Sequence, residues 1–202
     1  MAIKKSNKLV PDNNICIKGS VQLSSDKSLS IRSVLFASIA YGISHIKINN
    51  PGEDALTSIM AIKKLGIKIT QSDNQYTIYG LGIGYPSLKK RLLINCRNSG
   101  TTLRLLTPLI AGSKVNAKII GDHSLSKRPY RLEFLKEFLM NVKPTKKKFL
   151  PLMINGHANC VKAEIKINKP SAQMVSAATL AGISSFGETI IECPNNVRDH
   201  TS

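Results

Sequence analysis

Tryptophan is absent from the 202-residue chain, and aromatic residues make up only 5% of it. Few rings are therefore present to stack on nucleic-acid bases. Because no apolar run reaches about 18 residues, we expect no membrane-spanning helix. Residues 1–10 contain lysines with no apolar stretch after them, so we expect no signal peptide. The 42% hydrophobic content suffices for one substantial core or two small ones.

Cysteine is also scarce, and its spacing excludes the common metal patterns. The cysteines are Cys16, Cys96, Cys160 and Cys193, and the histidines are His45, His123, His157 and His200. No two cysteines form a C-x-x-C pair, and the histidines complete no zinc-binding pattern. We expect no metal site, and we interpret all four cysteines as small buried side chains of a cytoplasmic protein.

Acidic residues are few: 12 Asp and Glu face 29 Lys and Arg, which gives a net charge of +17. One interpretation is an anionic partner, such as nucleic acid, a membrane surface or a phosphorylated metabolite. The other is a lysine-rich composition spread over a solvated surface. Because residues 143–148 form the only dense basic run, the second interpretation accounts for most of the excess.

Three segments of the chain follow one plan, at residues 26–42, 98–112 and 169–182. Each opens with small polar residues, continues as an apolar stretch and reaches a glycine, and these glycines are separated by 70 residues. This pattern predicts three capped helices, each followed by a strand. We expect three similar α/β units that pack around shared helices, with their sheets outside.

The first two units continue alike. Residues 55–66 and 131–139 predict a second helix in each, because their apolar positions recur at three and four. Further strands follow the helix predicted at residues 55–66. The glycine-rich stretch 80–86 is interpreted as a turn or linker. The third unit stops before its second helix and hairpin, so we expect part of its apolar surface to be uncovered.

The three helix starts are candidate anion sites, because helix N-termini offer unpaired N–H groups and partial positive charge. Their polar residues are Ser24, Ser25, Lys27 and Ser28 in the first, Asn98 to Thr102 in the second, and Ser171 and Gln173 in the third. Arg32 lies one turn into the first helix and adds a planar cation. If the units are arranged around a three-fold axis, these ends converge on one site.

Two further motifs carry charge. Arg128 precedes Pro129, which favours an extended conformation outside the following helix and suits a carboxylate or phosphate ligand. Near the C-terminal end, Arg198, Asp199 and His200 are adjacent, which is a weak indication of acid–base chemistry. Both motifs also fit ordinary solvated loops.

Five ordered motifs resemble the 5-enolpyruvylshikimate-3-phosphate synthase family. They are S-S-D-K-S-L-S-I-R (24–32), N-S-G-T-T-L-R (98–104), G-D-H-S-L-S-K-R-P (121–129), P-S-A-Q (170–173) and R-D-H-T-S (198–202). The resemblance implies an α/β fold of repeated βαβαββ units, in two lobes. Residues 1–20 would supply strands of the other lobe, and 21–202 one lobe with an incomplete third unit.

The resemblance also implies substrates and ligands. Phosphoenolpyruvate would transfer its enolpyruvyl group to the 5-hydroxyl of 3-phosphoshikimate, in the shikimate pathway of aromatic amino-acid biosynthesis, without metal or organic cofactor. The implied 3-phosphoshikimate ligands are Lys27, Ser28, Arg32, Ser171, Ala172, Gln173 and Arg198. The implied phosphoenolpyruvate ligands are Lys27, Gly100, Arg128 and Gln173.

The family's acid–base carboxylates belong to its second half, so we assign no catalytic residue and expect this chain alone to be inactive. The missing C-terminal lobe is the expected protein partner. Alternatives are a lobe similar to UDP-N-acetylglucosamine enolpyruvyl transferase, an inactive remnant, and a basic nucleic-acid-binding module. The scarcity of aromatic residues argues against the last.

Overall fold

The structure is a computed structural model, and it describes residues 23–88 and 90–194. The expected N-terminal strands of residues 1–20, Cys16 and the candidate ligand Arg198 lie outside the described residues. Within these ranges, every helix is too short or too polar to cross a membrane.

The described elements fall into three successive units. The first comprises α1 (Lys27–Ile39), β1 (Tyr41–Lys47), α2 (Glu53–Lys64), β2 (Lys68–Ser72) and β3 (Gln75–Leu81). The second comprises β4 (Leu92–Asn95), α3 (Gly100–Ala111), β5 (Asn116–Ile120), α4 (His123–Ser126), the 3₁₀ helix η1 (Glu133–Phe138), β6 (Asn141–Lys146) and β7 (Phe149–Asn155). The third comprises β8 (Glu164–Lys166), α5 (Ala172–Ile183) and β9 (Ile190–Glu192).

Strand pairing shows that the units repeat. In the second unit the strand order is β4-β5-β7-β6, with β4 parallel to β5 and β7 antiparallel to both β5 and β6. The first unit shows the same plan from α1 onward, with order β1-β3-β2. The third unit shows the parallel pair β8-β9 with α5 between them in sequence. The predicted α/β fold of repeated βαβαββ units is confirmed.

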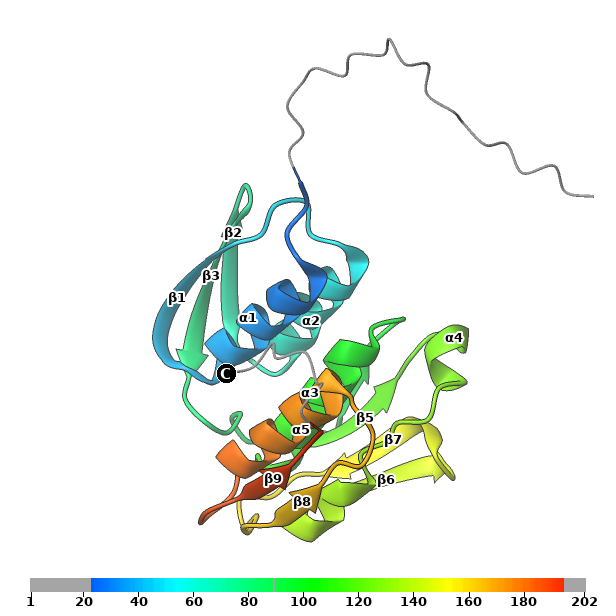
Figure 1. Cartoon of the computed structure of the whole chain (residues 1–202). Coiled ribbons are helices and arrows are strands. Elements are labelled where there is room, and N and C mark those ends of the chain that lie inside the picture. Colours follow the sequence, from blue (N-terminus) through cyan, green and yellow to red (C-terminus); the bar gives the residue numbers. More distant parts are fainter. Residues whose placement is uncertain (1–22, 89, 195–202) are drawn as a thin grey trace, which may run out of the picture.

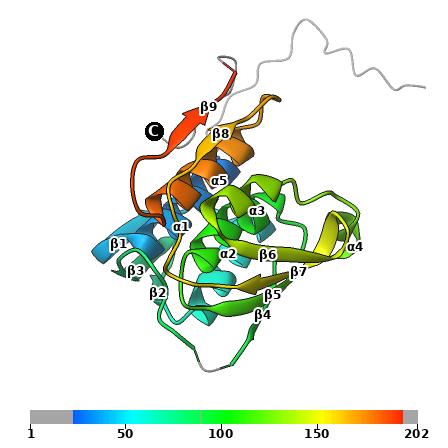
Figure 2. The same ribbon diagram turned by 90° about the horizontal axis from the view of Figure 1, so that it is seen from below.

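The helices α1, α3 and α5 lie in the middle of the molecule, and the three sheets surround them on different sides (Figures 1 and 2). Side chains on almost every position of α3 are buried, which is the pattern of a helix enclosed by other elements. The predicted arrangement, with shared helices inside and sheets outside, is therefore confirmed.

Two glycines mark equivalent points of the first two units. A Cβ atom on Gly80, near the end of β3, would collide with the carbonyl oxygens of Ala37 and Ala40 at the end of α1. A Cβ atom on Gly156, just after β7, would collide with the carbonyl oxygen of Ile110 at the end of α3. Glycine thus lets the last strand of each unit approach the C-terminal end of its central helix.

Four local predictions are corrected. Residues 131–139 do not form an α-helix, because Leu132, Leu135 and Phe138 are buried at spacings of three, which suits the 3₁₀ helix η1. Gly42 lies inside β1 with φ of 110°, and Gly182 lies inside α5, so neither ends a helix. Cys193 is exposed, whereas Cys96 and Cys160 are buried as predicted.

Candidate anion-binding site

The N-terminal parts of α1, α3 and α5 are joined by side-chain hydrogen bonds. Arg32 on α1 donates from Nη2 to Oγ of Ser176 on α5, at 2.9 Å. Gln173 on α5 donates from Nε2 to Oγ1 of Thr101 on α3, at 2.9 Å. In Figure 1 the three helices run alongside one another. The predicted convergence of the helix starts is confirmed by these contacts.

The first helix start presents one exposed and one buried cation. Asp26 caps α1, accepting a hydrogen bond from the backbone N–H of Leu29 at 2.8 Å. Lys27 is exposed, and its Nζ lies 3.4 Å from Oδ2 of Asp54 at the start of α2. Arg32 is only 3% exposed, and its guanidinium contacts Ser176 on α5.

A hollow of about 330 Å³ lies beside this helix start. Its wall includes Ser24, Ser25, Lys27 and Ser30, together with two carboxylates, Asp54 and Glu53, of which Glu53 pairs with Arg97. The hydroxyls and the ammonium suit an anion, while the carboxylate of Asp54 neutralises part of the lysine charge. An anion that binds Lys27 therefore has to displace Asp54 or bind beside it. The Lys27–Asp54 ion pair is weak, because the lysine is exposed.

The second helix start is organised around Arg128. This exposed arginine donates from Nη2 to Oδ1 of Asn98 at 3.0 Å and to Oγ of Ser124 at 2.9 Å. Asn98 in turn donates to Oδ2 of Asp122 at 2.8 Å. Hydrogen bonds from the backbone N–H of Leu125 and from Asn98 hold the pKa of Asp122 below its usual value. Arg128 lies beyond α4, in the loop, as predicted.

Arg104 is the site residue that the sequence reasoning missed. Its Nη1 donates to the carbonyl oxygen of Gly100 at 3.2 Å and to Oε1 of Gln173 at 3.0 Å. Its Nη2 donates to the carbonyl oxygen of Pro129 at 3.1 Å. Burial, then the charges of Arg131 and Arg128, lowers its pKa from the usual arginine value. Arg104 thus connects the second and third helix starts with the loop that carries Arg128.

A signal for Arg104 was present in the repeat. Arg32, Arg104 and Ser176 each lie four residues beyond Ser28, Gly100 and Ala172. Each of the three side chains donates to the carbonyl oxygen four residues before it, at 3.4, 3.2 and 2.8 Å respectively. All three side chains lie in the second turn of their helices, so comparison of these turns would have drawn attention to Arg104 beside Arg32.

The third helix start, residues 171–173, carries no charged side chain. Ser171 is the N-cap residue of α5, without a side-chain capping hydrogen bond, and Ala172 is the first helical residue. Gln173 follows, half-buried between Thr101 and Arg104. Side-chain contacts across the helices thus involve Arg32 and Gln173 among the predicted ligands, whereas Lys27 pairs with Asp54 and Arg128 with Asn98 and Ser124. The predicted ligand Arg198 lies outside the described residues.

The arrangement can bind and orient an anion. Helix N-terminal N–H groups and the cations Lys27, Arg32, Arg104 and Arg128 share one end of the helix layer. Among the described residues, no group of three His, Cys, Asp or Glu side chains is placed to hold a metal ion.

Comparisons with known proteins agree with this geometry. The family model of EPSP synthase (3-phosphoshikimate 1-carboxyvinyltransferase) matches residues 12–202. The 3-phosphoshikimate 1-carboxyvinyltransferases of Streptococcus pyogenes serotypes M49 and M28 are each 36% identical over 188 residues, covering 92% of this chain. The match covers 44% of each relative, so the chain spans about half the length of these proteins.

A solved structure shows the same fold. The EPSP synthase from Acinetobacter baumannii superposes with a TM-score of 0.82 at 33% sequence identity. The superposition covers 91% of this chain and 42% of that protein. The chain therefore corresponds to about one lobe of the larger fold.

Proposed function

Because the chain belongs to the EPSP synthase family, we propose that it binds 3-phosphoshikimate at its converging helix starts and takes part in enolpyruvyl transfer. In this reaction the 5-hydroxyl oxygen of 3-phosphoshikimate bonds to the enolpyruvyl carbon of phosphoenolpyruvate. Phosphate then leaves. The observation that carries the proposal is the hydrogen-bonded junction of α1, α3 and α5, with cations from two of the three units.

The two substrates are proposed to have separate ligand sets that share Lys27 and Gln173. The 3-phosphoshikimate ligands are Lys27, Ser28, Arg32, Ser171, Ala172, Gln173 and Arg198. The phosphoenolpyruvate ligands are Lys27, Gly100, Arg128 and Gln173. Phosphate and carboxylate groups suit these positions, because cations and helix N–H groups form charge-assisted hydrogen bonds with them. The proposal places the protein in the cytoplasm, where thiols such as Cys96 stay reduced.

Turnover is proposed to need the rest of the enzyme. Residues 21–202 would form one lobe, and residues 1–20 would pair with the other. General acid–base groups commonly contribute about 10²–10⁴-fold each. We assign none to the described residues, so the isolated chain should release no phosphate from the two substrates.

The test is a calorimetric titration of the chain with 3-phosphoshikimate at fixed salt. Lys27→Ala should weaken binding by about 1–3 kcal/mol, the range of charge-assisted hydrogen bonds. Asp54→Asn should tighten it slightly, because Lys27 then has no ion pair with Asp54 to give up. Lys146→Ala, at an exposed position at the end of strand β6, is the matched control and should change nothing.

Equal losses for Lys27→Ala and Lys146→Ala would show diffuse charge attraction and contradict the proposed site. The absence of any 3-phosphoshikimate binding by the unaltered chain would contradict it as well.

A further inference from the structure

Arg128 differs in its contacts from two other exposed cations beside the helix starts. Nζ of Lys27 lies 3.4 Å from a carboxylate oxygen of Asp54, and Nη1 of Arg97 lies 2.8 Å from a carboxylate oxygen of Glu53. Within the described part of the chain, Arg128 forms no such ion pair. Its positive charge is therefore not neutralised by a carboxylate in contact with it.

The amide of Asn98 lies between Arg128 and the carboxylate of Asp122. Its Oδ1 accepts from Nη2 of Arg128 at 3.0 Å, and its Nδ2 donates to Oδ2 of Asp122 at 2.8 Å. The reverse orientation of the amide would place donor against donor and acceptor against acceptor. An amide thus suits a cation on one side and an anion on the other, whereas a carboxylate at this position would repel Asp122.

Asp122 fixes both acceptors of Arg128. Its Oδ2 holds Asn98, and its Oδ1 accepts from the backbone N–H of Leu125 at 2.7 Å, which caps α4. Ser124 lies in this capped turn, and its Oγ accepts from Nη2 of Arg128 at 2.9 Å. One carboxylate therefore orients the guanidinium through two neutral groups and does not touch it.

This arrangement occupies only one nitrogen of Arg128. Both hydrogen bonds start from Nη2, and among residues 23–88 and 90–194 Nε and Nη1 have no acceptor. A guanidinium presents five N–H donors in one plane, so an oxyanion can accept from the remaining donors while the two existing bonds persist. Arg128 is thus anchored and still able to bind a carboxylate or phosphate group.

The first unit shows the alternative. Asp54, in the first turn of α2 after β1, pairs directly with Lys27. Asp122, which caps α4 after β5, bonds to Asn98 and not to a cation. Both turns place a carboxylate near a helix start, but only the second unit inserts a neutral side chain between that carboxylate and the cation.

We propose that Asn98 is a positioning residue for anion binding: its amide anchors Arg128 and prevents a direct ion pair between Arg128 and Asp122. Arg128 then meets the carboxylate or phosphate group of phosphoenolpyruvate with its charge not neutralised. For the identity of this anion, the inference rests on the proposed function. Asn98 acts through Arg128, and its effect does not require contact with the substrate.

The experiment titrates the full chain with phosphoenolpyruvate at fixed salt, followed by nuclear magnetic resonance. Asn98→Asp should weaken binding about tenfold, because the new carboxylate would pair with Arg128 and compete with the ligand. Asn98→Ala adds no charge and should weaken binding about threefold, because Arg128 loses one anchor and Asp122 can pair with it. Unchanged affinity in both variants would overturn the proposal.

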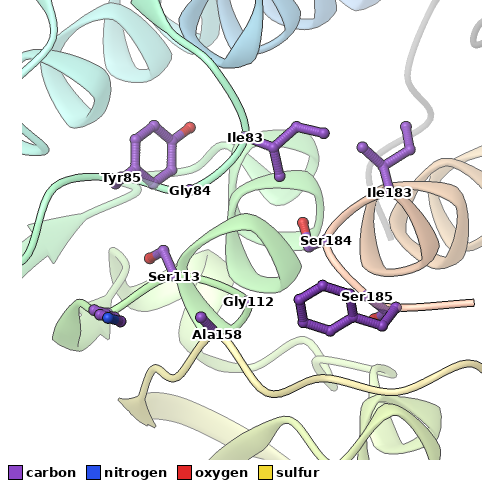
Figure 3. Close-up of a pocket in the computed structure, with 11 residues that line it drawn as sticks. Ile83, Gly84, Tyr85, Gly112, Ser113, Ala158, Ile183, Ser184 and Ser185 are labelled. Atoms are coloured by element: carbon purple, nitrogen blue, oxygen red, sulfur yellow. The ribbon is translucent and has the colours of Figure 1, made fainter.

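Asn155→Asp is the matched control. Asn155 is also exposed, and its Oδ1 accepts from Nη2 of Arg91 at 2.9 Å. A Cβ atom on the next residue, Gly156, would collide with the carbonyl oxygen of Ser113, which lines the hollow of about 440 Å³ at the C-terminal ends of α3 and α5 (Figure 3). The control thus makes the same chemical change at the other end of α3 and should leave phosphoenolpyruvate binding unchanged. A loss equal to that of Asn98→Asp would show diffuse repulsion and overturn the proposal.

A double-mutant cycle with Arg128→Ala tests whether Asn98 acts through Arg128. In the Arg128→Ala background, Asn98→Asp should weaken binding by at most about twofold, because no guanidinium remains to be neutralised. A general disturbance of the helix start would not depend on Arg128 in this way. A full tenfold loss in that background would therefore contradict the assigned role.

Chemical labelling separates this inference from the proposed function. Phenylglyoxal modifies arginine, and mass spectrometry gives the rate at each residue. Asn98→Asp should slow the labelling of Arg128 severalfold, and Asn155→Asp that of Arg91, because a direct ion pair stabilises the charged, unreactive guanidinium. Inorganic phosphate should protect Arg128 in the unaltered chain and protect it less in Asn98→Asp.

The two measurements have separate outcomes. If no variant bound phosphoenolpyruvate while the labelling results held, the proposed function would be contradicted and the role of Asn98 toward Arg128 would stand. If Arg128 were labelled at the same rate in Asn98→Asp and in the unaltered chain, or phosphate protected both equally, the role of Asn98 would be overturned.

Discussion

Replacement of Arg104 by alanine should destabilise the chain more than any other single change at the candidate site. The guanidinium is half-buried and donates three hydrogen bonds, to Gly100, Gln173 and Pro129. Hydrogen bonds from charged groups contribute about 1.5–3 kcal/mol each, but removal of one side chain is not additive over its bonds. We expect a loss of about 2–4 kcal/mol in the free energy of unfolding.

The assay is urea denaturation followed by circular dichroism. With a slope of about 2 kcal/mol/M, Arg104→Ala should lower the midpoint by about 1–2 M. Arg104→Lys should give an intermediate loss, because an ammonium keeps the charge but cannot reproduce the planar arrangement of three donors. The slope should stay unchanged, so that the midpoint shift reports stability alone.

Arg128→Ala is the matched control for this prediction. Arg128 also donates two side-chain hydrogen bonds, but its partners Asn98 and Ser124 are exposed and can bind water instead. Its loss should be within about 0.5 kcal/mol. If Arg104→Ala and Arg128→Ala unfolded at the same urea concentration, the assigned role of Arg104 in joining the helix starts would be refuted.

Three further predictions concern glycine, pH and thiols. In Gly100→Ala the added Cβ would lie 2.7 Å from Nη1 of Arg104 and displace this group from its hydrogen bonds to Gly100 and Gln173, so we expect a loss of about 1 kcal/mol in unfolding experiments; no loss would contradict this contact. The pKa of Asp122 is lower in the folded than in the unfolded chain, so its carboxylate stabilises the fold above the unfolded pKa, and this stabilisation is lost as pH falls through the folded pKa. Asp122→Asn should therefore reduce the loss of unfolding free energy that acid causes in a stability–pH curve. Burial raises the pKa of Cys96 to about 12, so iodoacetamide at neutral pH should label the exposed Cys193 before Cys96. Faster labelling of Cys96, measured by mass spectrometry, would disprove the assignment.

Helix starts were predictable from sequence because their signals are local. Asp26 and Ser99 each cap a helix by accepting from a backbone N–H three residues ahead. The equal spacing of the three segments then predicted the repeated units. Neither inference required knowledge of contacts between distant parts of the chain.

Helix ends were less predictable, because packing decides them. Gly182 is helical since α5 continues to Ile183, and a Cβ on this glycine would lie 3.1 Å from that of Thr189, next to β9. The segment 131–139 has helical spacing in its sequence, yet burial at every third residue selects a 3₁₀ turn. Both outcomes depend on neighbours that a local pattern does not contain.

Arg104 illustrates the same limit within the site. Its acceptors lie 69 residues away in Gln173 and 25 residues away in Pro129. The motif N-S-G-T-T-L-R contains this arginine, but only the folded arrangement shows that it reaches the third helix. A residue that connects two helices has no local signature beyond its place in the repeat.

The three units are alike in backbone and different in charge, and this difference explains how the junction holds together. In the second turn the first and second helices carry Arg32 and Arg104, while the third carries Ser176. The third helix accepts hydrogen bonds from both arginines: Ser176 accepts from Arg32, and Gln173 accepts from Arg104. The guanidinium groups of Arg32 and Arg104 are thereby hydrogen-bonded to one uncharged helix. Because this helix carries no carboxylate, their positive charge can attract an anion to the helix starts. A cation in place of Ser176 would remove the hydrogen-bond acceptor of Arg32 and repel its guanidinium. The uncharged residue at this point of the third helix therefore lets the positively charged site coexist with the packing of the three helices.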